Sequence, residues 1–222
     1  MLFETREEDI KMEELNSKKA IVKEILEWVY CIIIAIALAL IIRYFIGTPT
    51  VVQQTSMKPT LEQGERLILN RICRTFNTGY NRGDIITFEA PKKIQVSSPK
   101  AEYEDEPTNL FSKFAYYVLE ANKTSFIKRI VGMPGEHVII KNGKVYINGE
   151  QLEEKYLQSG VITEAKNSNL SDFIVPEGYV FAIGDNRQGS MDCRYFGCIP
   201  IEKIESKVWI RFWPLNLFGK VE

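Results

Sequence analysis

The stretch from Gly184 to Gly197 reads Gly-Asp-Asn-Arg-Gln-Gly-Ser-Met-Asp-Cys-Arg-Tyr-Phe-Gly and directly follows an apolar run, Tyr179 to Ile183. It carries charges of both signs, on Asp185, Arg187, Asp192 and Arg194. A buried charge without a partner is strongly destabilising, so this stretch predicts a fixed frame of ion pairs. A fixed frame of ion pairs would position side chains from another part of the chain. The candidate side chains lie upstream in the sequence.

Composition limits the class of protein. With 222 residues, 45% hydrophobic content and a net charge of -1, the chain can form one substantial domain or a domain with a small insert. The near-neutral balance and the lack of a local basic patch argue against a nucleic-acid partner. The four cysteines, Cys31, Cys73, Cys193 and Cys198, match no zinc spacing, and the single histidine, His137, cannot complete a site. We therefore expect no metal and no cofactor.

The N-terminal part predicts a membrane anchor. Residues 1–24 form a mixed-charge tail, and residues 25–46 would span about 33 Å as a helix, enough for a hydrocarbon core of about 30 Å. Two alternatives are a removable signal peptide, because small residues occur at Ala35, Ala37 and Ala39, and a buried helix of a soluble protein. The long charged tail argues against the first, and the uniform Ile, Leu and Ala content argues against the second.

Flanking charges predict the orientation of this anchor. Basic residues precede the span at Lys11, Lys18, Lys19 and Lys23, whereas Arg43 and Lys58 are the nearest ones at its end and beyond. By the positive-inside rule the N-terminus lies inside and residues 47–222 lie on the extracytoplasmic side. Disulfides are permitted there. A bridge between Cys193 and Cys198 is conceivable, but the position of Cys193 between two charged residues of the predicted frame argues against it.

Residues 47–222 have the pattern of a mainly β domain built from antiparallel sheet. Short apolar segments alternate with Gly, Pro and Asn turns, at residues 51–54, 66–72, 85–88, 126–131, 137–140, 144–147, 179–183 and 207–212. Asn142-Gly143 between two of these segments indicates a hairpin. The polar segment that follows suggests a small inserted β subdomain over residues 141–176.

A second insert, residues 91–124, interrupts the strands and ends in a short amphipathic helix. Leu110, Phe114 and Tyr117 recur at helical spacing. The helix either packs its apolar side on the sheet, which is the plainer interpretation, or lies at a lipid surface with Phe111 and Phe114 exposed.

Two short motifs carry the chemistry. Ser56 lies in Ser-Met-Lys-Pro-Thr-Leu, and Lys128 lies in Phe-Ile-Lys-Arg-Ile-Val-Gly-Met-Pro-Gly-Glu. Together with the stretch from Gly184 to Gly197 and with Gly83 to Phe88, these motifs occur in the order of the signature boxes of the type I signal peptidases, which the chain resembles. The resemblance implies a serine endopeptidase with a β-rich catalytic domain and no cofactor.

By this resemblance Ser56 is the nucleophile and Lys128 the general base, acting through an acyl-enzyme. A lysine is protonated at neutral pH unless its pKa of about 10.4 is lowered. The apolar neighbours of Lys128 suit such a shift, because Phe126, Ile127, Ile130 and Val131 surround it in sequence. His137 lies in an ordinary strand context, so we do not expect a Ser-His pair.

The same resemblance assigns supporting roles. Ser190 would hydrogen-bond to the Lys128 amine and orient it. Asp192 and Arg194, aided by Arg129, would form the salt-bridge frame, while Asp185 would shape the turn. The strand from Gly83 to Phe88 would line the substrate cleft and offer its edge to an extended peptide, although an ordinary core strand is equally compatible with its sequence.

The chain departs from the family pattern at two positions. Cys193 replaces the usual serine after the aspartate of the last box, which weakens the expected hydrogen bonding there. Gln54 replaces a small residue two positions before Ser56. The backbone N–H of Ser56 is one oxyanion donor, and strand alternation would place Gln54 on the same side as Ser56, so its amide is a candidate for the second. Alternatively, Gln54 is a residue at the rim of the site, where any polar side chain would be tolerated.

The function expected from the sequence is the removal of N-terminal signal peptides from exported preproteins at the outer face of the cytoplasmic membrane. Its partners would be signal peptides, membrane lipid and the nearby export machinery. One alternative is a self-cleaving repressor, which shares the Ser-Lys pair but would carry a DNA-binding domain in place of residues 1–46. Another is a non-catalytic tethered interaction domain, which would be expected to lose part of the set Ser56, Lys128 and Ser190.

Overall fold

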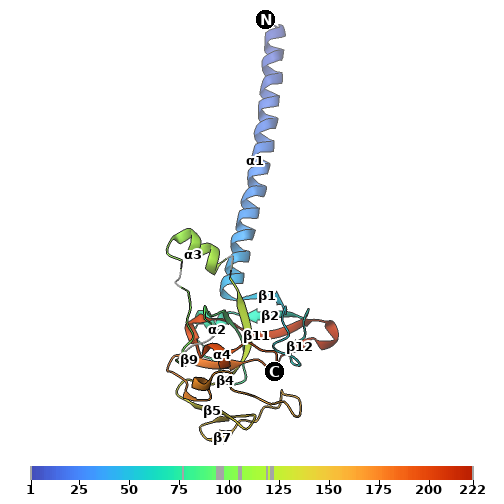
Figure 1. The fold of residues 1–222 in the computed structure, drawn as a ribbon. Helices are drawn as coiled ribbons and strands as arrows, with labels where there is room; N and C mark the ends of the chain where they lie inside the picture. The colour runs from blue at the N-terminus through green and yellow to red at the C-terminus, as the bar shows by residue number, and fades with distance from the viewer. Residues whose placement is uncertain are drawn as a thin grey trace. The chain divides into compact units, whose positions relative to one another are not determined.

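The computed structural model describes residues 2–76, 78–93, 98–104, 107–118, 120 and 123–221, with side chains from Lys18 onward. The chain divides into two compact units, Met1–Ile42 and Arg43–Glu222. The first unit is helical, and the second contains the β-sheets and ends at the C-terminus (Figure 1).

Helix α1, Leu2–Phe45, makes up the first unit and continues for three residues into the second. Its segment Lys18–Phe45 is long and apolar enough to cross a membrane by length and composition. None of its most apolar window is buried. The structure therefore gives no support to the alternative in which this helix is the buried core of a soluble protein.

The second unit is built on a mainly antiparallel sheet, as predicted. Its strands are β1 (Gly47–Val51), β2 (Arg66–Asn70), β3 (Ile85–Glu89), β4 (Ser125–Gly132), β9 (Tyr179–Ile183), β10 (Ile199–Pro200), β11 (Ile204–Trp213) and β12 (Gly219–Lys220). They lie in the order β1-β2-β11-β3-β4-β9-β10, with β12 paired to β11. Two short helices, α2 (Ile72–Phe76) and α4 (Cys193–Phe196), follow β2 and β9, and three single turns of 3-10 helix occupy Ser168–Leu170, Ile201–Lys203 and Leu215–Leu217.

A smaller four-stranded sheet is inserted between β4 and β9. It consists of β5 (His137–Lys141), β6 (Lys144–Ile147), β7 (Glu150–Gln151) and β8 (Asp172–Ile174), in the order β7-β6-β5-β8. Asn142 and Gly143 connect β5 to β6 with φ angles of 51° and 75°. These positive φ angles are the geometry that the Asn-Gly pair favours in a two-residue hairpin.

The two faces of the large sheet are covered by different apolar clusters. Neighbouring residues Ile85 and Ile86 belong to separate clusters, as expected because successive strand side chains point to opposite faces. The larger cluster joins the large sheet to the small one. The smaller cluster includes Met57 and Leu61, which lie within the predicted nucleophile motif and are fully buried.

Two of the open strand edges of the large sheet belong to β1 and to the first half of β4. β1 pairs only with β2, so its other edge is open. β9 pairs with β4 only from Arg129 onward, so Ser125 to Lys128 pair on one side alone, with β3. β3 itself is paired on both sides, by β11 and β4. The expectation that the edge of the Gly83–Phe88 strand receives a peptide is therefore wrong, because that edge is already occupied.

Helix α3, Leu110–Tyr117, lies in the insert where helical spacing predicts a helix. Asn109 caps it by accepting a hydrogen bond from the Ser112 N–H at 2.7 Å. No residue of α3 is buried, and Leu110 and Phe111 are 86% and 81% exposed. The first turn of α3 therefore does not pack on the sheet, while Ala115, Tyr116 and Tyr117 at its end are half-buried.

All four cysteines are free thiols, including the buried pair Cys193 and Cys198. The bridge between Cys193 and Cys198, which the sequence already disfavours, is not formed.

The exposure of α3 leads to a stability prediction. Replacing both Leu110 and Phe111 with Asp should change the free energy of unfolding by no more than about 0.5 kcal/mol per substitution, as for other surface changes. Phe88→Ala is the control, because Phe88 is fully buried and truncation of a buried Phe costs about 3 to 5 kcal/mol. Denaturant unfolding of the full chain in detergent micelles measures both. A loss above about 2 kcal/mol in the double variant would mean that α3 packs on the core.

Candidate active site

Ser56 lies in a tight turn just after β1, held in place by its buried neighbours. Met57 and Leu61 anchor the turn in the smaller apolar cluster, and the Leu61 N–H donates to the Met57 carbonyl at 2.9 Å. Ser56 itself is 4% exposed. The local sequence therefore positions a hydroxyl that is shielded from bulk water.

Lys128 reaches this hydroxyl from β4. Its Nζ donates to Ser56 Oγ at 2.9 Å and to the Ile127 carbonyl at 2.9 Å. The amine also lies 5.3 Å from the centre of the Phe126 ring, and Lys128 is 1% exposed. The structure thus brings together the two residues for which the sequence predicts catalysis, although 72 positions separate them.

Burial lowers the pKa of Lys128 to about 8 from its usual 10.5. The loss of solvation disfavours the ammonium form, while the nearby Asp192 carboxylate opposes the shift and the Arg194 guanidinium adds to it. A lysine with such a pKa holds a sizeable neutral fraction near neutral pH. It can therefore accept a proton, which an ordinary lysine does poorly.

Asp185 fixes both halves of the pair. Its carboxylate receives two hydrogen bonds from Arg129, Nε to Oδ1 at 3.0 Å and Nη2 to Oδ2 at 2.8 Å. The same Oδ2 accepts from Thr60 Oγ1 at 2.6 Å. Arg129 follows Lys128 in β4, and Thr60 lies in the Ser56 turn. The expected partnership of Arg129 with Asp192 and Arg194 is therefore wrong, because Arg129 pairs with Asp185.

Asp192 and Arg194 form a second buried pair within the loop itself. Two bonds of 2.9 Å join the Arg194 Nε and Nη2 to the two carboxylate oxygens. Asp192 also accepts from the Gly184 N–H at 3.0 Å, and Arg194 Nη2 donates to the Arg187 carbonyl at 2.8 Å. The pair therefore connects the start of the loop, at Gly184 and Arg187, to its later part, at Asp192 and Arg194.

Cys193, between these two residues, retains a polar contact. Its Sγ accepts from the Ala182 N–H at 3.2 Å. Burial raises the pKa of this thiol well above its usual value. Cys193 is thus an uncharged packing residue.

The small sheet contributes residues that the sequence analysis missed. Arg187 is fully buried and pairs with Glu154, with Nη1 at 3.1 Å from Oε2. Tyr156 places its ring 4.0 Å from the Arg129 guanidinium carbon. Glu154 and Tyr156 lie in a polar segment whose sequence gives no signal of this role.

The loop also contacts the nucleophile turn through backbone groups. The Asn186 N–H donates to the Ser56 carbonyl at 3.0 Å, and its side-chain amide donates to the Thr55 carbonyl at 3.2 Å. A Cβ at Gly184 would lie 2.5 Å from the Ser56 carbonyl oxygen and 2.2 Å from Ser190 Oγ. Only glycine permits this close approach.

Ser190 does not make the expected bond. Its Oγ is buried without a hydrogen-bond partner among the described residues, and the bonds recorded for the Lys128 amine go to Ser56 and Ile127. The prediction that Ser190 orients the amine by a hydrogen bond is therefore wrong in this structure. The Ser190 hydroxyl instead lies against Gly184, where a Cβ would be only 2.2 Å from Ser190 Oγ.

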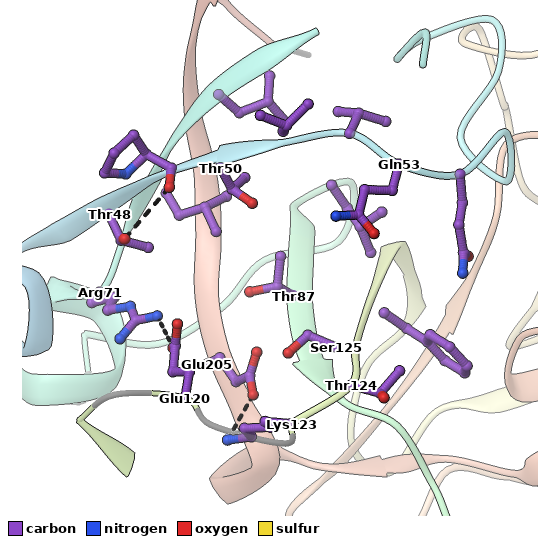
Figure 2. Close-up of a pocket in the computed structure, with 18 of the residues that line it drawn as sticks. Thr48, Thr50, Gln53, Arg71, Thr87, Glu120, Lys123, Thr124, Ser125 and Glu205 are labelled. Carbon is purple, nitrogen blue, oxygen red and sulfur yellow. Dashed lines mark hydrogen bonds and ion pairs between the residues drawn. The ribbon is translucent and has the colours of Figure 1, made fainter. Parts of the chain in front are cut away.

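A cleft of about 460 Å³ lies between the two open strand edges and extends to Gln54, two positions before Ser56, and to Ile127, the residue before Lys128 (Figure 2). One wall comes from β1 and the residues that follow it, up to Gln54, and the other from residues 124–127 at the start of β4. Because both walls have unpaired edges, an extended peptide can bind there by adding a strand.

Gln54 is exposed and lines this cleft. The strand alternation that would place it on the same side as Ser56 does not hold, because β1 ends at Val51 and Ser56 lies in a turn. Gln54 is a neighbour of the reacting pair because it lines the cleft, and not because of strand alternation.

The described residues contain no group of three or more His, Cys, Asp or Glu side chains that could hold a metal ion. His137 lies in β5 of the small sheet, where its Nε2 is 2.6 Å from Asp172 Oδ1. It therefore makes no contact with Ser56.

Comparison with known proteins identifies the family of the chain. The sequence model of the family described as "Signal peptidase, peptidase S26" matches residues 25–213. The "Probable signal peptidase I-1" of Synechocystis is 34% identical over 190 residues, covering 86% of this chain and 83% of the relative. "Signal peptidase IB" of Staphylococcus aureus is 32% identical over 209 residues, covering 88% and 93%. A crystal structure of a signal peptidase I from Enterococcus faecalis is 31% identical, with a TM-score of 0.38, over 59% of this chain and 97% of that one.

Both the family match and the identity to these relatives extend over most of the chain. The chain therefore belongs to the signal peptidase family, peptidase S26, and is a serine endopeptidase.

Proposed function

We propose that this protein removes signal peptides from preproteins with Ser56 as nucleophile and Lys128 as general base, through an acyl-enzyme. The observation that carries the proposal is the 2.9 Å hydrogen bond between Lys128 Nζ and Ser56 Oγ, both buried. Their neighbours Gln54 and Ile127 line a cleft that is large enough for a peptide. The relatives that share most of the chain are named signal peptidases.

The chemistry follows from the protonation state of Lys128. The neutral amine takes the proton from Ser56 Oγ as the oxygen attacks the carbonyl carbon of the scissile bond. The tetrahedral intermediate collapses when the Lys128 ammonium gives this proton to the leaving amine, which leaves the acyl group on Ser56 as an ester. Lys128 then accepts a proton from the water that hydrolyses the ester.

Two donors are candidates for stabilising the oxyanion. The backbone N–H of Ser56 is the first, as in other enzymes of this type of mechanism. The side-chain amide of Gln54 is the second, because it lines the cleft and can donate through its NH₂ group.

The membrane placement is part of the proposal. Residues 1–24 form a cytoplasmic tail, the apolar part of α1 anchors the chain once, and residues 47–222 form the extracytoplasmic catalytic domain. The flanking Lys residues support this orientation. The exposed apolar side chains of α3 support contact with membrane lipid, and Glu120 just beyond α3 pairs with Arg43 at the end of the candidate span, at 3.0 Å. We also expect the protein to act close to the export machinery.

The assignment of the pair predicts that Ser56→Ala and Lys128→Ala each abolish cleavage of a fluorogenic signal-peptide substrate. The double variant should be no worse than either single one, because residues that act as one unit are not additive. Ser159→Ala and Lys141→Ala are matched controls at exposed positions and should retain full activity. Near-normal turnover in either Ser56→Ala or Lys128→Ala would refute the assignment.

The pKa of Lys128 near 8 predicts the pH dependence. Below this pKa the amine is protonated and cannot accept the Ser56 proton, so kcat should fall about tenfold for each pH unit below it. Above it the neutral form dominates and the rate should level off. A pH–rate profile measures this, and a rate that is already saturated at pH 6 would contradict it.

The oxyanion role of Gln54 is tested by Gln54→Glu, which keeps the shape and removes the donor. If Gln54 donates to the oxyanion, kcat should fall about 10²- to 10³-fold with little change in KM. Gln53→Glu is the control at the exposed neighbouring position. A Gln54→Glu enzyme within a few-fold of wild type would leave the oxyanion to backbone groups alone.

A further inference from the structure

The end of the cleft away from Ser56 and Lys128 is strongly charged (Figure 2). Five ionisable side chains line it: Arg43, Arg71, Glu120, Lys123 and Glu205. None of them contacts the Ser56–Lys128 pair, and the chemistry proposed above uses none of them. They come from the end of α1, the residue after β2, the segment between α3 and β4, and β11.

Ion pairs connect the side chains of this group. Lys123 pairs with Glu205 at 2.7 Å and lies 3.9 Å from Glu89, and Glu120 is shared between Arg71 and Arg43. Burial alone would raise the pKa of Glu120, but the two arginines hold it below its usual value, so Glu120 is ionised.

Arg71 has unused hydrogen-bonding capacity. Its side chain is 3% exposed, and one nitrogen, Nη2, bonds to Glu120. The other two, Nε and Nη1, are buried and have no hydrogen-bond partner among the described residues. Buried donors in folded proteins nearly always have a hydrogen-bond acceptor. Two donors without an acceptor, on a guanidinium that lines a cleft, therefore indicate that a ligand supplies the acceptor.

The backbone holds Arg71 in this position. Its N–H donates to the Ile46 carbonyl at 2.9 Å, next to the pairing of Thr48 with Leu69 at the start of β1. The backbone of Arg71 is therefore fixed at the end of the cleft where β1 begins.

Strand direction relates this end to the cleavage point. β1 runs from Thr48 toward Ser56, and β4 runs from Ser125 toward Lys128, so both walls run in the same direction. A substrate strand parallel to them has its scissile bond at Ser56 and its upstream residues at Arg71. A strand rises about 3.3 Å per residue. A substrate strand that extends along this wall from Ser56 toward Thr48 would therefore bring a residue roughly four to seven positions upstream of the cut close to Arg71.

We propose that Arg71 is a specificity-determining residue that binds an acidic side chain of the substrate about four to seven residues upstream of the scissile bond. The positive charge of the Arg71 guanidinium disfavours lysine and arginine at the same place. This inference rests on the proposed function, because it assumes that the cleft receives the cleaved peptide.

The test uses the wild-type full chain in detergent micelles and a set of fluorogenic peptides. Each peptide carries Glu, Gln or Lys at one position from four to seven residues upstream of the cut. At one of these positions kcat/KM should be at least tenfold higher for Glu than for Lys, with Gln between them. Equal values of kcat/KM for the three residues at all positions would overturn the proposal.

Arg71→Gln should remove this preference. The difference between the Glu and Lys peptides should shrink to less than threefold, while the Gln peptide should be cleaved within about threefold of the wild-type rate. Arg66→Gln is the matched control, because Arg66 lies in the neighbouring strand β2 and is exposed, and should keep the preference. A purely structural role of Arg71 would lower the activity toward all peptides equally, and that result would also overturn the proposal.

A binding experiment separates this inference from the proposed function. The full chain with Ser56→Ala is titrated with the labelled Glu, Gln and Lys peptides, and Kd is measured by fluorescence anisotropy. Tighter binding of the Glu peptide than the Lys peptide by at least tenfold supports the role of Arg71 even if wild type cleaves no peptide, in which case the proposed function alone fails. Equal Kd values for the Glu and Lys peptides overturn the inference while leaving cleavage by wild type unaffected.

Discussion

The structure of the site depends on one buried carboxylate. Asp185 bonds to Arg129, the residue after Lys128, and to Thr60, four residues after Ser56. Strands and turns bring the two motifs into the same region, but a lysine amine and a serine hydroxyl must be held to a fraction of an ångström to exchange a proton. A carboxylate that accepts from both segments provides this restraint. Because Asp185 and Arg129 are both buried, removing either partner would leave an uncompensated charge, which is far more costly than losing an exposed ion pair.

The ion pairs and the apolar surroundings of Lys128 act together. Desolvation lowers its pKa, and the buried carboxylates nearby would reverse that shift if they were not themselves neutralised. Asp192 is paired with Arg194, and Asp185 with Arg129. The pairing thus allows a loop rich in aspartate to lie against a lysine that must lose its proton. The loop contains two aspartates and two arginines, and Asp192 and Arg194 are the two that pair within the loop.

Much of the fold follows from the sequence. The main strands were predictable because short apolar segments are separated by Gly, Pro and Asn turns. The Ser56–Lys128 pair was predictable from the motifs around the two residues. The partners of the buried arginines were not, since sequence spacing does not show that Arg129 selects Asp185 or that Arg187 selects Glu154. The side of Gln54 was predicted from an alternation that fails where β1 ends at Val51. The sequence predicted a hydrogen bond from Ser190 to Lys128. In the structure the Ser190 hydroxyl instead lies against Gly184.

The contact between Arg187 and Glu154 has a consequence for the architecture of the protein. The small sheet, β5 to β8, is a separate set of strands with its own hairpins, and it looks like a removable appendage in the order of the chain. Yet Glu154 neutralises a fully buried arginine of the catalytic loop, and Tyr156 covers Arg129. A shortened protein without this sheet would expose two guanidinium groups on which the loop geometry depends. The inserted subdomain that contains the small sheet therefore stabilises the catalytic loop. A minimal version of the enzyme must retain this subdomain or supply a carboxylate and an aromatic ring in its place.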